Sequence, residues 1–307
     1  MTAPDASAAM APQPRWTPRR VLGLVLVIFG ACLLLVQSWQ FVRSSPVVWQ
    51  ALMGGSVAAL ATALGALPVL FSQRLSDRVQ DALFGFGAGV MLAACAFSLI
   101  MPGLEAAKAQ MLWGGGAWAA GGVVGAAILL GGAALMLMDK VLPHEHFIKG
   151  REGQDALAGR QLRRTWLFVF AIALHNLPEG LAIGVGYAGS DSVGANALAT
   201  GIAIQDVPEG LVVAVALLAA GYRRWVAVAL GMASGLVEPI GAVIGAAVIE
   251  QSAAMLPWGL GFAAGAMLFV ISHEIIPESH RKGHEAFATG GLMLGFVLMM
   301  LLDTALG

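Results

Sequence analysis

Charged residues are scarce in this chain. Only 11% of its 307 residues are Asp, Glu, Lys or Arg, and its mean hydropathy is +0.80. Water-soluble domains carry about 25% charged residues, so this composition excludes an ordinary soluble domain. The formal net charge is −1, and the chain has no basic soluble segment that would bind nucleic acid. Nucleic acid is therefore not expected as a partner.

Cysteines are few, and nucleotide-binding motifs are absent. The two cysteines, Cys32 and Cys95, both lie in apolar runs, with no CxxC or zinc-type Cys/His spacing. Each is predicted to be a small buried hydrophobic residue rather than a metal ligand. No GxxxxGK[ST] sequence occurs in the chain, which excludes a P-loop for nucleotide phosphates.

Long apolar stretches dominate the chain instead. A stretch of about 20 apolar residues is long enough to cross a bilayer as a helix. The sequence therefore predicts an all-α, polytopic integral membrane helix bundle, with the lipid bilayer as its surroundings. The nine predicted spans are 21–40, 49–72, 80–103, 111–138, 165–187, 194–220, 224–249, 255–279 and 286–305. Residues 1–20, rich in Ala, Pro and Met, are predicted to be a disordered cytoplasmic leader.

The distribution of Lys and Arg orients the spans. With the N-terminus in the cytoplasm and the spans alternating in direction, 15 of the 17 basic residues lie in cytoplasmic segments, and only Arg43 and Lys108 lie outside. Such a split is typical of the positive-inside rule. An eight-span form that begins at 49 would keep every later segment on the same side. The longest polar connection, 139–164, is cytoplasmic in both forms.

Two near-copies of one motif lie thirty residues apart, HNLPEG at 175–180 and QDVPEG at 205–210. Each lies inside a predicted span, where ionisable side chains are costly and usually face a partner, a cavity or a substrate. The proline of each copy removes the helical partner of the carbonyl four residues earlier, at Leu174 and Ile204. Both spans are therefore predicted to be kinked helices that line a polar site.

The polar residues of each motif share one helix face. At about 100° per residue, positions i, i+1 and i+4 lie on the same side of a helix. The next span adds a carboxylate before a proline, Glu238. The set comprises one imidazole, two side-chain amides and four carboxylates: His175, Asn176, Glu179, Gln205, Asp206, Glu209 and Glu238.

A divalent cation would neutralise these carboxylates, which have no local Lys or Arg. Mixed nitrogen and oxygen ligands suit zinc and similar metals. Glu179 and Glu209 occupy the same position of the two copies and are placed to bridge two ions. The alternative is that the residues only form hydrogen bonds between kinked helices.

A second group of candidate ligands lies at the predicted cytoplasmic ends of two spans. One part is His273 and Glu274, and the other, at the start of the polar connection, comprises Asp139, His144 and His146. Together they suggest a metal relay on the exit side, although a solvated helix end would have the same composition.

Three further acidic residues lie near span ends. Asp303, near the outer end of the last span, is placed to attract cations. Asp81 and Glu105, at the two ends of the third span, are predicted to be solvated or helix-capping.

The HNLPEG motif followed by a QDVPEG motif resembles the ZIP (Zrt/Irt-like protein) family of divalent metal transporters, especially bacterial members with an extra N-terminal span. The resemblance covers 49–306. It implies eight core transmembrane helices, one extra helix at 21–40 and a cytoplasmic metal-binding loop at 139–164. It also implies a multi-pass protein of the bacterial inner membrane that moves zinc toward the cytoplasm by alternating access. The metal-carrying helices would slide, elevator-like, against a scaffold.

The resemblance also implies a binuclear centre between the spans at 165–187 and 194–220. The first metal would be held by Met91, His175, Glu179, Gln205 and Glu209. The second would be held by Asn176, Glu179, Asp206, Glu209 and Glu238. Met91 enters this set through the resemblance alone, since a lone methionine is usually a packing residue. The exit route implied by the resemblance uses Asp139, His144, His146, His273 and Glu274.

Two other functions are open to the same residues. A divalent-metal exporter would use the same ligands, since direction depends on gradients and ion coupling. An intramembrane metalloprotease needs HExxH, but Asn follows His175, and Pro277 stands where the second His would follow His273. The chain is therefore predicted not to be an enzyme. Zinc is the first candidate metal, cadmium, iron and manganese remain open, and glycine-rich faces permit a homodimer.

Overall fold

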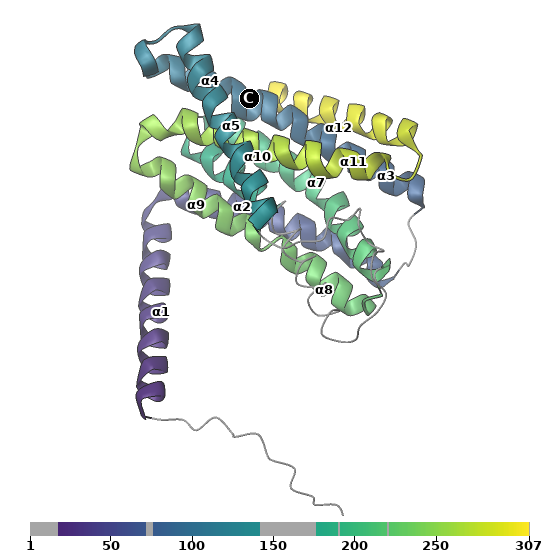
Figure 1. Ribbon diagram of the computed structural model, residues 1–307, viewed down its shortest axis with the longest axis horizontal. Helices are drawn as coiled ribbons and strands as arrows, with labels where there is room; N and C mark the ends of the chain where they lie inside the picture. Colours follow the sequence, from purple (N-terminus) through teal and green to yellow (C-terminus); the bar gives the residue numbers. More distant parts are fainter. Residues whose placement is uncertain (1–17, 72–75, 142–175, 190, 220, 307) are drawn as a thin grey trace, which may run out of the picture. The chain divides into compact units, whose positions relative to one another are not determined.

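The computed structural model describes residues 18–71, 76–141, 176–189, 191–219 and 221–306. The described residues form helices and no strand (Figure 1). They divide into two compact units, Met1–Ser44 and Ser45–Gly307, and the helix of the first unit is α1 (Pro18–Ser44). The second unit contains α2 (Pro46–Ala66), α3 (Asp77–Ala93), α4 (Met101–Ala109), α5 (Ala117–Val141), a helix at 176–188, α7 (Ser192–Ala219), α8 (Arg224–Ser234), α9 (Val237–Gln251), α10 (Leu256–Val270), α11 (Ile276–His280) and α12 (Glu285–Leu306).

Seven of the described helical segments are long and apolar enough to cross a membrane. They are Pro46–Leu70, Asp77–Ala109, Ala117–Lys140, Ser192–Leu218, Arg224–Gln251, Ala253–His280 and Glu285–Ala305. Each coincides with one of the predicted spans, and the predicted all-α polytopic bundle is confirmed. The predicted span at 165–187 is described only from residue 176. Residues 1–17 of the predicted leader and most of the polar connection lie outside the described residues, and the last three residues of the leader belong to α1.

Two of the long spans widen into π-helix just before a proline. In the span Asp77–Ala109 the π segment η2 (Ala94–Ile100) precedes Pro102, and in Ala253–His280 the segment η6 (Ile271–Ile275) precedes Pro277. A proline ring clashes with the carbonyl four residues earlier and offers no N–H to it. Widening the turn relieves that clash, and such π segments often occur at functional positions.

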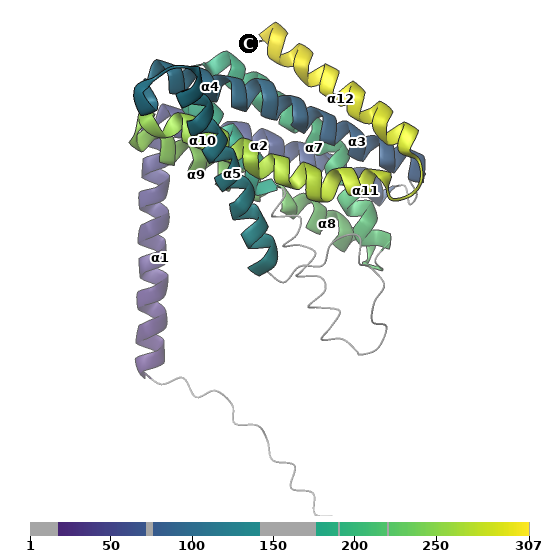
Figure 2. The same cartoon turned by 45° about the horizontal axis from the view of Figure 1, so that its top comes forward.

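Glycines bring the helix backbones into direct contact in matched pairs. A Cβ atom at Gly180 would overlap the backbone carbonyl of Glu238 on α9, and one at Gly184 would overlap that of Ala242. In the other direction, a Cβ atom at Gly241 of α9 would press against the backbone of the helix at 176–188. The same reciprocal packing joins α2 to α7, α3 to α12 and α5 to α10. The views in Figures 1 and 2 both show α12 lying along α3. Small residues permit this approach where lipid provides no hydrophobic drive for association.

Three expectations from the sequence are wrong. Cys32 is exposed on α1, whereas Cys95 is buried as expected. Asp81 is neither solvated nor a cap, because the chain between α11 and α12 covers the start of α3 and places the His284 Nδ1 atom 3.1 Å from Asp81 Oδ2. The polar connection begins later than 139, because α5 continues through Val141 and holds Asp139 in its last turn. Glu105 is exposed, as expected.

Candidate metal centre

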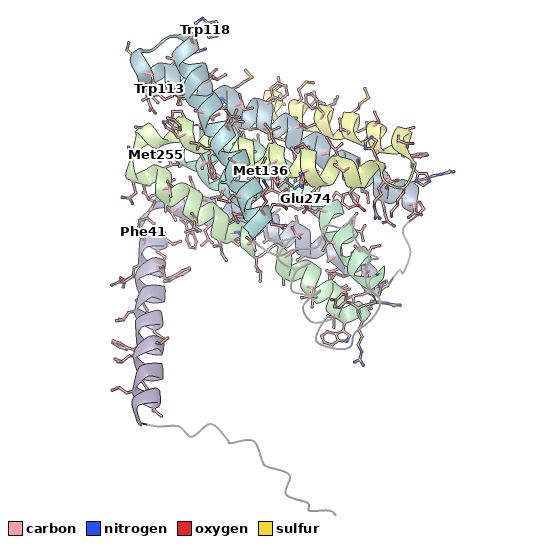
Figure 3. The ribbon with its side chains drawn as sticks, viewed as in Figure 1. Phe41, Trp113, Trp118, Met136, Met255 and Glu274 are labelled. Carbon is pink, nitrogen blue, oxygen red and sulfur yellow. The ribbon has the colours of Figure 1, made fainter. Side chains whose placement is uncertain are left out.

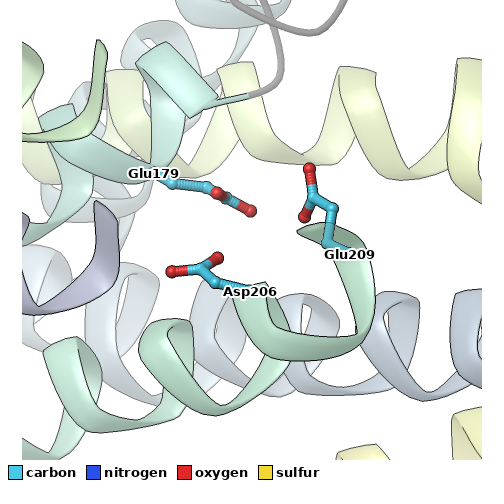
Figure 4. A group of neighbouring side chains, drawn as sticks. All are labelled: Glu179, Asp206 and Glu209. Atoms are coloured by element: carbon cyan, nitrogen blue, oxygen red, sulfur yellow. The ribbon is translucent and has the colours of Figure 1, made fainter. Parts of the chain in front are cut away.

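Three carboxylates from two helices converge inside the second unit. Glu179 belongs to the helix at 176–188, and Asp206 and Glu209 belong to α7, in which Pro208 lies mid-helix. One oxygen from each residue lies within 4.8 Å of the others. Figure 4 shows the three side chains pointing toward one another. Glu179 and Asp206 are fully buried, and Glu209 is half-buried. Such an arrangement of oxygens can hold a divalent cation.

Gln205 ties two of these carboxylates together. Its Nε2 atom donates to Glu179 Oε1 at 2.6 Å and to Asp206 Oδ1 at 2.7 Å. Its Oε1 atom lies 3.3 Å from the place a Cβ at Gly87 would take, so α3 passes close beside it. Met91 lies one turn beyond Gly87 on α3 and is buried. The third predicted span therefore approaches Gln205 at Gly87, and Met91 is buried on the same helix.

Glu238 belongs to a second group of hydrogen bonds. The break between α8 and α9 puts Glu238 in the first turn of α9, where the helix dipole favours a negative charge. Its Oε1 atom accepts from Asn176 Nδ2 at 2.8 Å and from Thr62 Oγ1 at 2.9 Å. Asn176 and Glu179 are one turn apart on the same helix. The two groups of hydrogen bonds therefore share that helix.

Thr62 is a further candidate residue of the centre, which the sequence does not indicate. Its one signal is a hydroxyl group in an otherwise apolar stretch of α2. That signal is weak, because serine and threonine in helices commonly bond to their own backbone. Ser56 does so on the same helix, donating to the carbonyl of Leu52 at 2.6 Å. Thr62 Oγ1 also lies 3.3 Å from the Ala58 carbonyl, but its shorter contact is with Glu238 Oε1, 176 residues away in the chain, which no local pattern reveals.

Four buried oxygen atoms of the centre accept no hydrogen bond from any described residue. They are Asn176 Oδ1, Glu179 Oε2, Asp206 Oδ2 and Glu238 Oε2. Leaving ionised oxygens buried without partners costs several kcal/mol or more each. Within the described ranges, no Lys or Arg forms an ion pair with Glu179, Asp206 or Glu238. A bound cation would compensate them, so the donor set fits a metal.

The structure thus brings together most of the residues predicted for the centre. Asn176, Glu179, Gln205, Asp206 and Glu238 are joined in the two hydrogen-bonded groups, and Glu209 faces Glu179 and Asp206. His175 lies outside the described residues, as do His144 and His146 of the predicted exit group.

Two other residues of the predicted exit group lie near each other. His273 Nε2 is 4.0 Å from Asp139 Oδ2, which brings the last turn of α5 to the π segment η6. The His273 side chain is 45% exposed and stacks on Phe269 with ring centroids 4.9 Å apart. Glu274 follows it in η6 (Figure 3). This pair is partly open to its surroundings, unlike the buried carboxylates of the centre.

Comparison with known proteins shows which family the chain belongs to. A family model described as ZIP Zinc transporter matches residues 144–303, just over half of the chain. Zinc transporter ZIPB of Bordetella bronchiseptica is 48% identical over 309 aligned residues, covering 99% of this chain and 98% of the relative. The chain belongs to the ZIP family. Other ZIP relatives are zinc transporter GufA of Myxococcus xanthus and zinc transporter ZIP11 of Homo sapiens. GufA is 46% identical, and the alignment covers 83% of this chain and 98% of GufA. Human ZIP11 is 32% identical, and the alignment covers 85% of this chain and 98% of ZIP11.

Replacing Thr62 tests whether it supports the metal centre. Thr62→Val removes the hydroxyl that donates to Glu238 at nearly constant volume. Loss of a bond that orients a ligand typically costs 10–100-fold in metal affinity, and we expect about tenfold here. Calorimetric titration of the detergent-purified protein with zinc measures it. Thr62→Ser should retain affinity, and Ser56→Ala should have no effect. An unchanged affinity in Thr62→Val would exclude Thr62 from the centre.

Proposed function

We propose that this ZIP family member transports zinc across the bacterial inner membrane toward the cytoplasm. The observation that carries the proposal is the group of buried carboxylates with unpartnered oxygens in a multi-pass membrane protein. The names of its relatives support zinc as the metal. An intramembrane charge cluster is conventionally a substrate or ion site. Cadmium, iron and manganese are the other divalent metals that this donor set would accept.

The proposed centre holds two metal ions. Met91, His175, Glu179, Gln205 and Glu209 would hold the first ion, and Asn176, Glu179, Asp206, Glu209 and Glu238 the second. Asn176 and Glu238, both assigned to the second ion, are hydrogen-bonded to each other, and Gln205 of the first ion donates both to the shared Glu179 and to Asp206 of the second. For the first ion, Gln205 would turn its amide oxygen toward the metal.

The proposed movement is a slide of the metal-carrying helices against the rest of the bundle. Close contacts at glycines join the helix at 176–188 to α9, and similar contacts join α2 to α7. Helix α2 also packs against α9. These four helices carry every described carboxylate of the centre. The pairs α3 with α12 and α5 with α10 form the opposing part. Backbone contacts within each part favour its movement as one body.

Metal would enter through a cavity of about 520 Å³ beside the bend between α3 and α4. Asp303, Glu105 and Asp191 line it, and Ser98 Oγ donates to Asp303 Oδ1 at 2.7 Å. The cavity reaches Leu198 of α7, seven residues or about two helical turns before Gln205. Its carboxylates would concentrate cations at the mouth.

Zinc flux into proteoliposomes tests the proposed function. Wild-type protein should take up zinc down its gradient, and His175→Ala and Glu209→Ala should abolish the uptake. Vesicles in which the protein has one known orientation distinguish import from export, the alternative function. Absence of uptake by the wild type, or undiminished uptake by both variants, would refute transport through this centre.

The proposed exit pair can be tested by combining two substitutions. We expect Asp139→Asn and His273→Ala each to slow zinc uptake about three- to tenfold, and the double variant to be no slower than the slower single variant. Residues that act as one unit show such non-additivity. His280→Ala is the control, because its ring contacts the Ile276 carbonyl and Ser279 on its own helix. If the double variant is slowed by the product of the two single effects, Asp139 and His273 act separately.

A further inference from the structure

An apolar groove lies between the metal-carrying helices and the opposing pair of helices. It has a volume of about 410 Å³, within the range of small-molecule sites. The helix at 176–188 and α9 form one wall, and α5 and α10 form the other. Representative lining residues are Leu130, Leu181, Val185, Val248, Trp258 and Phe262. No charged side chain lines it, so the occupant it suits is uncharged and apolar.

The surroundings of the groove identify that occupant. Three of the four helices are among the segments that can cross a membrane. The aliphatic side chains at the mouth are well exposed, with Leu130 56%, Ile244 47% and Val248 46% accessible. In a bilayer these side chains face hydrocarbon, and apolar cavities exclude water while accepting hydrocarbon. The molecules present there at high concentration are lipid acyl chains.

One end of the groove has the chemistry of a membrane surface. Trp258 lines the groove and packs edge-to-face on Trp113, with ring centroids 5.9 Å apart. Tryptophan is enriched at the headgroup level of membranes. Met255, also in the lining, follows the exposed polar residues Gln251 and Ser252 at the turn from α9 to α10. Figure 3 shows Met255 and Trp113 at the same end of the bundle.

The length of the groove also fits one leaflet. The lining on this side runs from Met255, in the turn just before α10, to Ala263 of α10, which is about 12 Å at the rise of an α-helix. Half of the hydrocarbon core is about 15 Å thick. A chain that enters beside the α9–α10 turn would therefore follow the groove over most of its leaflet.

We propose that this groove binds one acyl chain of a membrane phospholipid, in the leaflet where α9 turns into α10. The chain lies against the two helices that carry Glu179 and Glu238, and it separates them from α5 and α10. Binding of the lipid requires neither zinc nor transport, so it stands or falls independently of the proposed function.

Photolabelling tests the proposal. The full-length protein is reconstituted with phosphatidylethanolamine carrying a diazirine on one acyl chain, irradiated, and mapped by mass spectrometry. Labelling of the α10 lining at Phe262 should saturate as the probe fraction rises. Labelling at Leu294, 69% exposed on α12, should instead rise in proportion to the probe, as ordinary lipid contact does.

Filling the groove supplies the matched comparison. Ile244→Trp should reduce labelling of α10 at least about fivefold, because a filled cavity admits no second occupant. Leu294→Trp adds the same side chain outside the groove and should leave α10 labelling unchanged. Val248→Trp is a second filling variant in case the first does not fold. Labelling of α10 that never saturates, or that survives filling in a folded variant, would overturn the proposal.

Discussion

Glu179→Gln is expected to reduce zinc uptake into proteoliposomes at least about 100-fold, because even bonds that only orient a ligand are worth 10–100-fold in metal affinity. The substitution preserves volume but removes a charge from the carboxylate proposed to touch both ions. It also places an amide beside Gln205 Nε2, which now donates to Glu179 Oε1 at 2.6 Å. Initial rates measure the loss of zinc uptake, and calorimetric titration separately measures the loss of zinc affinity.

Glu250→Gln is the matched control for that experiment. Glu250 is a glutamate at the far end of α9, where it accepts from Ser45 Oγ at 2.7 Å. We expect its zinc uptake to stay within about twofold of wild type, since exposed substitutions away from a site have small effects. A Glu179→Gln protein that folds and keeps more than about one tenth of the wild-type rate would contradict the role of Glu179.

Gly180→Ala has the second largest expected effect, although it adds a single methyl group. The new Cβ would collide with the backbone carbonyl of Glu238, which has no flexible end that can move aside. We expect a loss of about 1–3 kcal/mol of stability, as overpacking usually costs. Zinc affinity should fall at least about tenfold, because the helix that carries Glu179 is pushed away from Glu238. Thermal unfolding in detergent and zinc titration measure the two effects.

Gly290→Ala is the control that separates the effect of the collision from the effect of replacing a helical glycine by alanine. Gly290 is also a helical glycine, on α12, but an added Cβ there meets nothing within 4 Å. Alanine in place of an unconstrained helical glycine stabilises by up to about 1 kcal/mol. Gly290→Ala should therefore be as stable as wild type or more so, with unchanged zinc affinity. Equal behaviour of the two variants would show that the Gly180 contact with α9 is loose.

The sequence predicts the helices and most of the metal centre for a simple reason. Apolar length alone determines which segments can cross a bilayer, and the 100° helical repeat places Gln205, Asp206 and Glu209 on one face without any tertiary information. Glu238 follows from the rarity of carboxylates in apolar spans. In the structure these residues indeed lie together with Glu179 and Asn176.

What the sequence could not predict depends on contacts between distant segments. Thr62 reaches Glu238 across 176 residues, and Asp81 is covered by a segment that begins 200 residues later. The approach of α3 to Gln205 at Gly87 comes from the packing of α3 on α7, which the residue types do not indicate. Prolines mark the two widened spans, but whether a helix kinks or forms a π turn depends on what packs against it.

The most direct test of the proposed centre is a metal-soaked crystal structure with anomalous scattering at the zinc edge. We expect two anomalous peaks between the helix at 176–188 and α7. Carboxylate oxygens of both Glu179 and Glu209 should lie about 2.0–2.2 Å from each ion, with Glu238 bound to one of them. A single peak, or peaks held by other residues while Glu179 and Glu209 remain unligated, would contradict a centre in which the two glutamates share two metals.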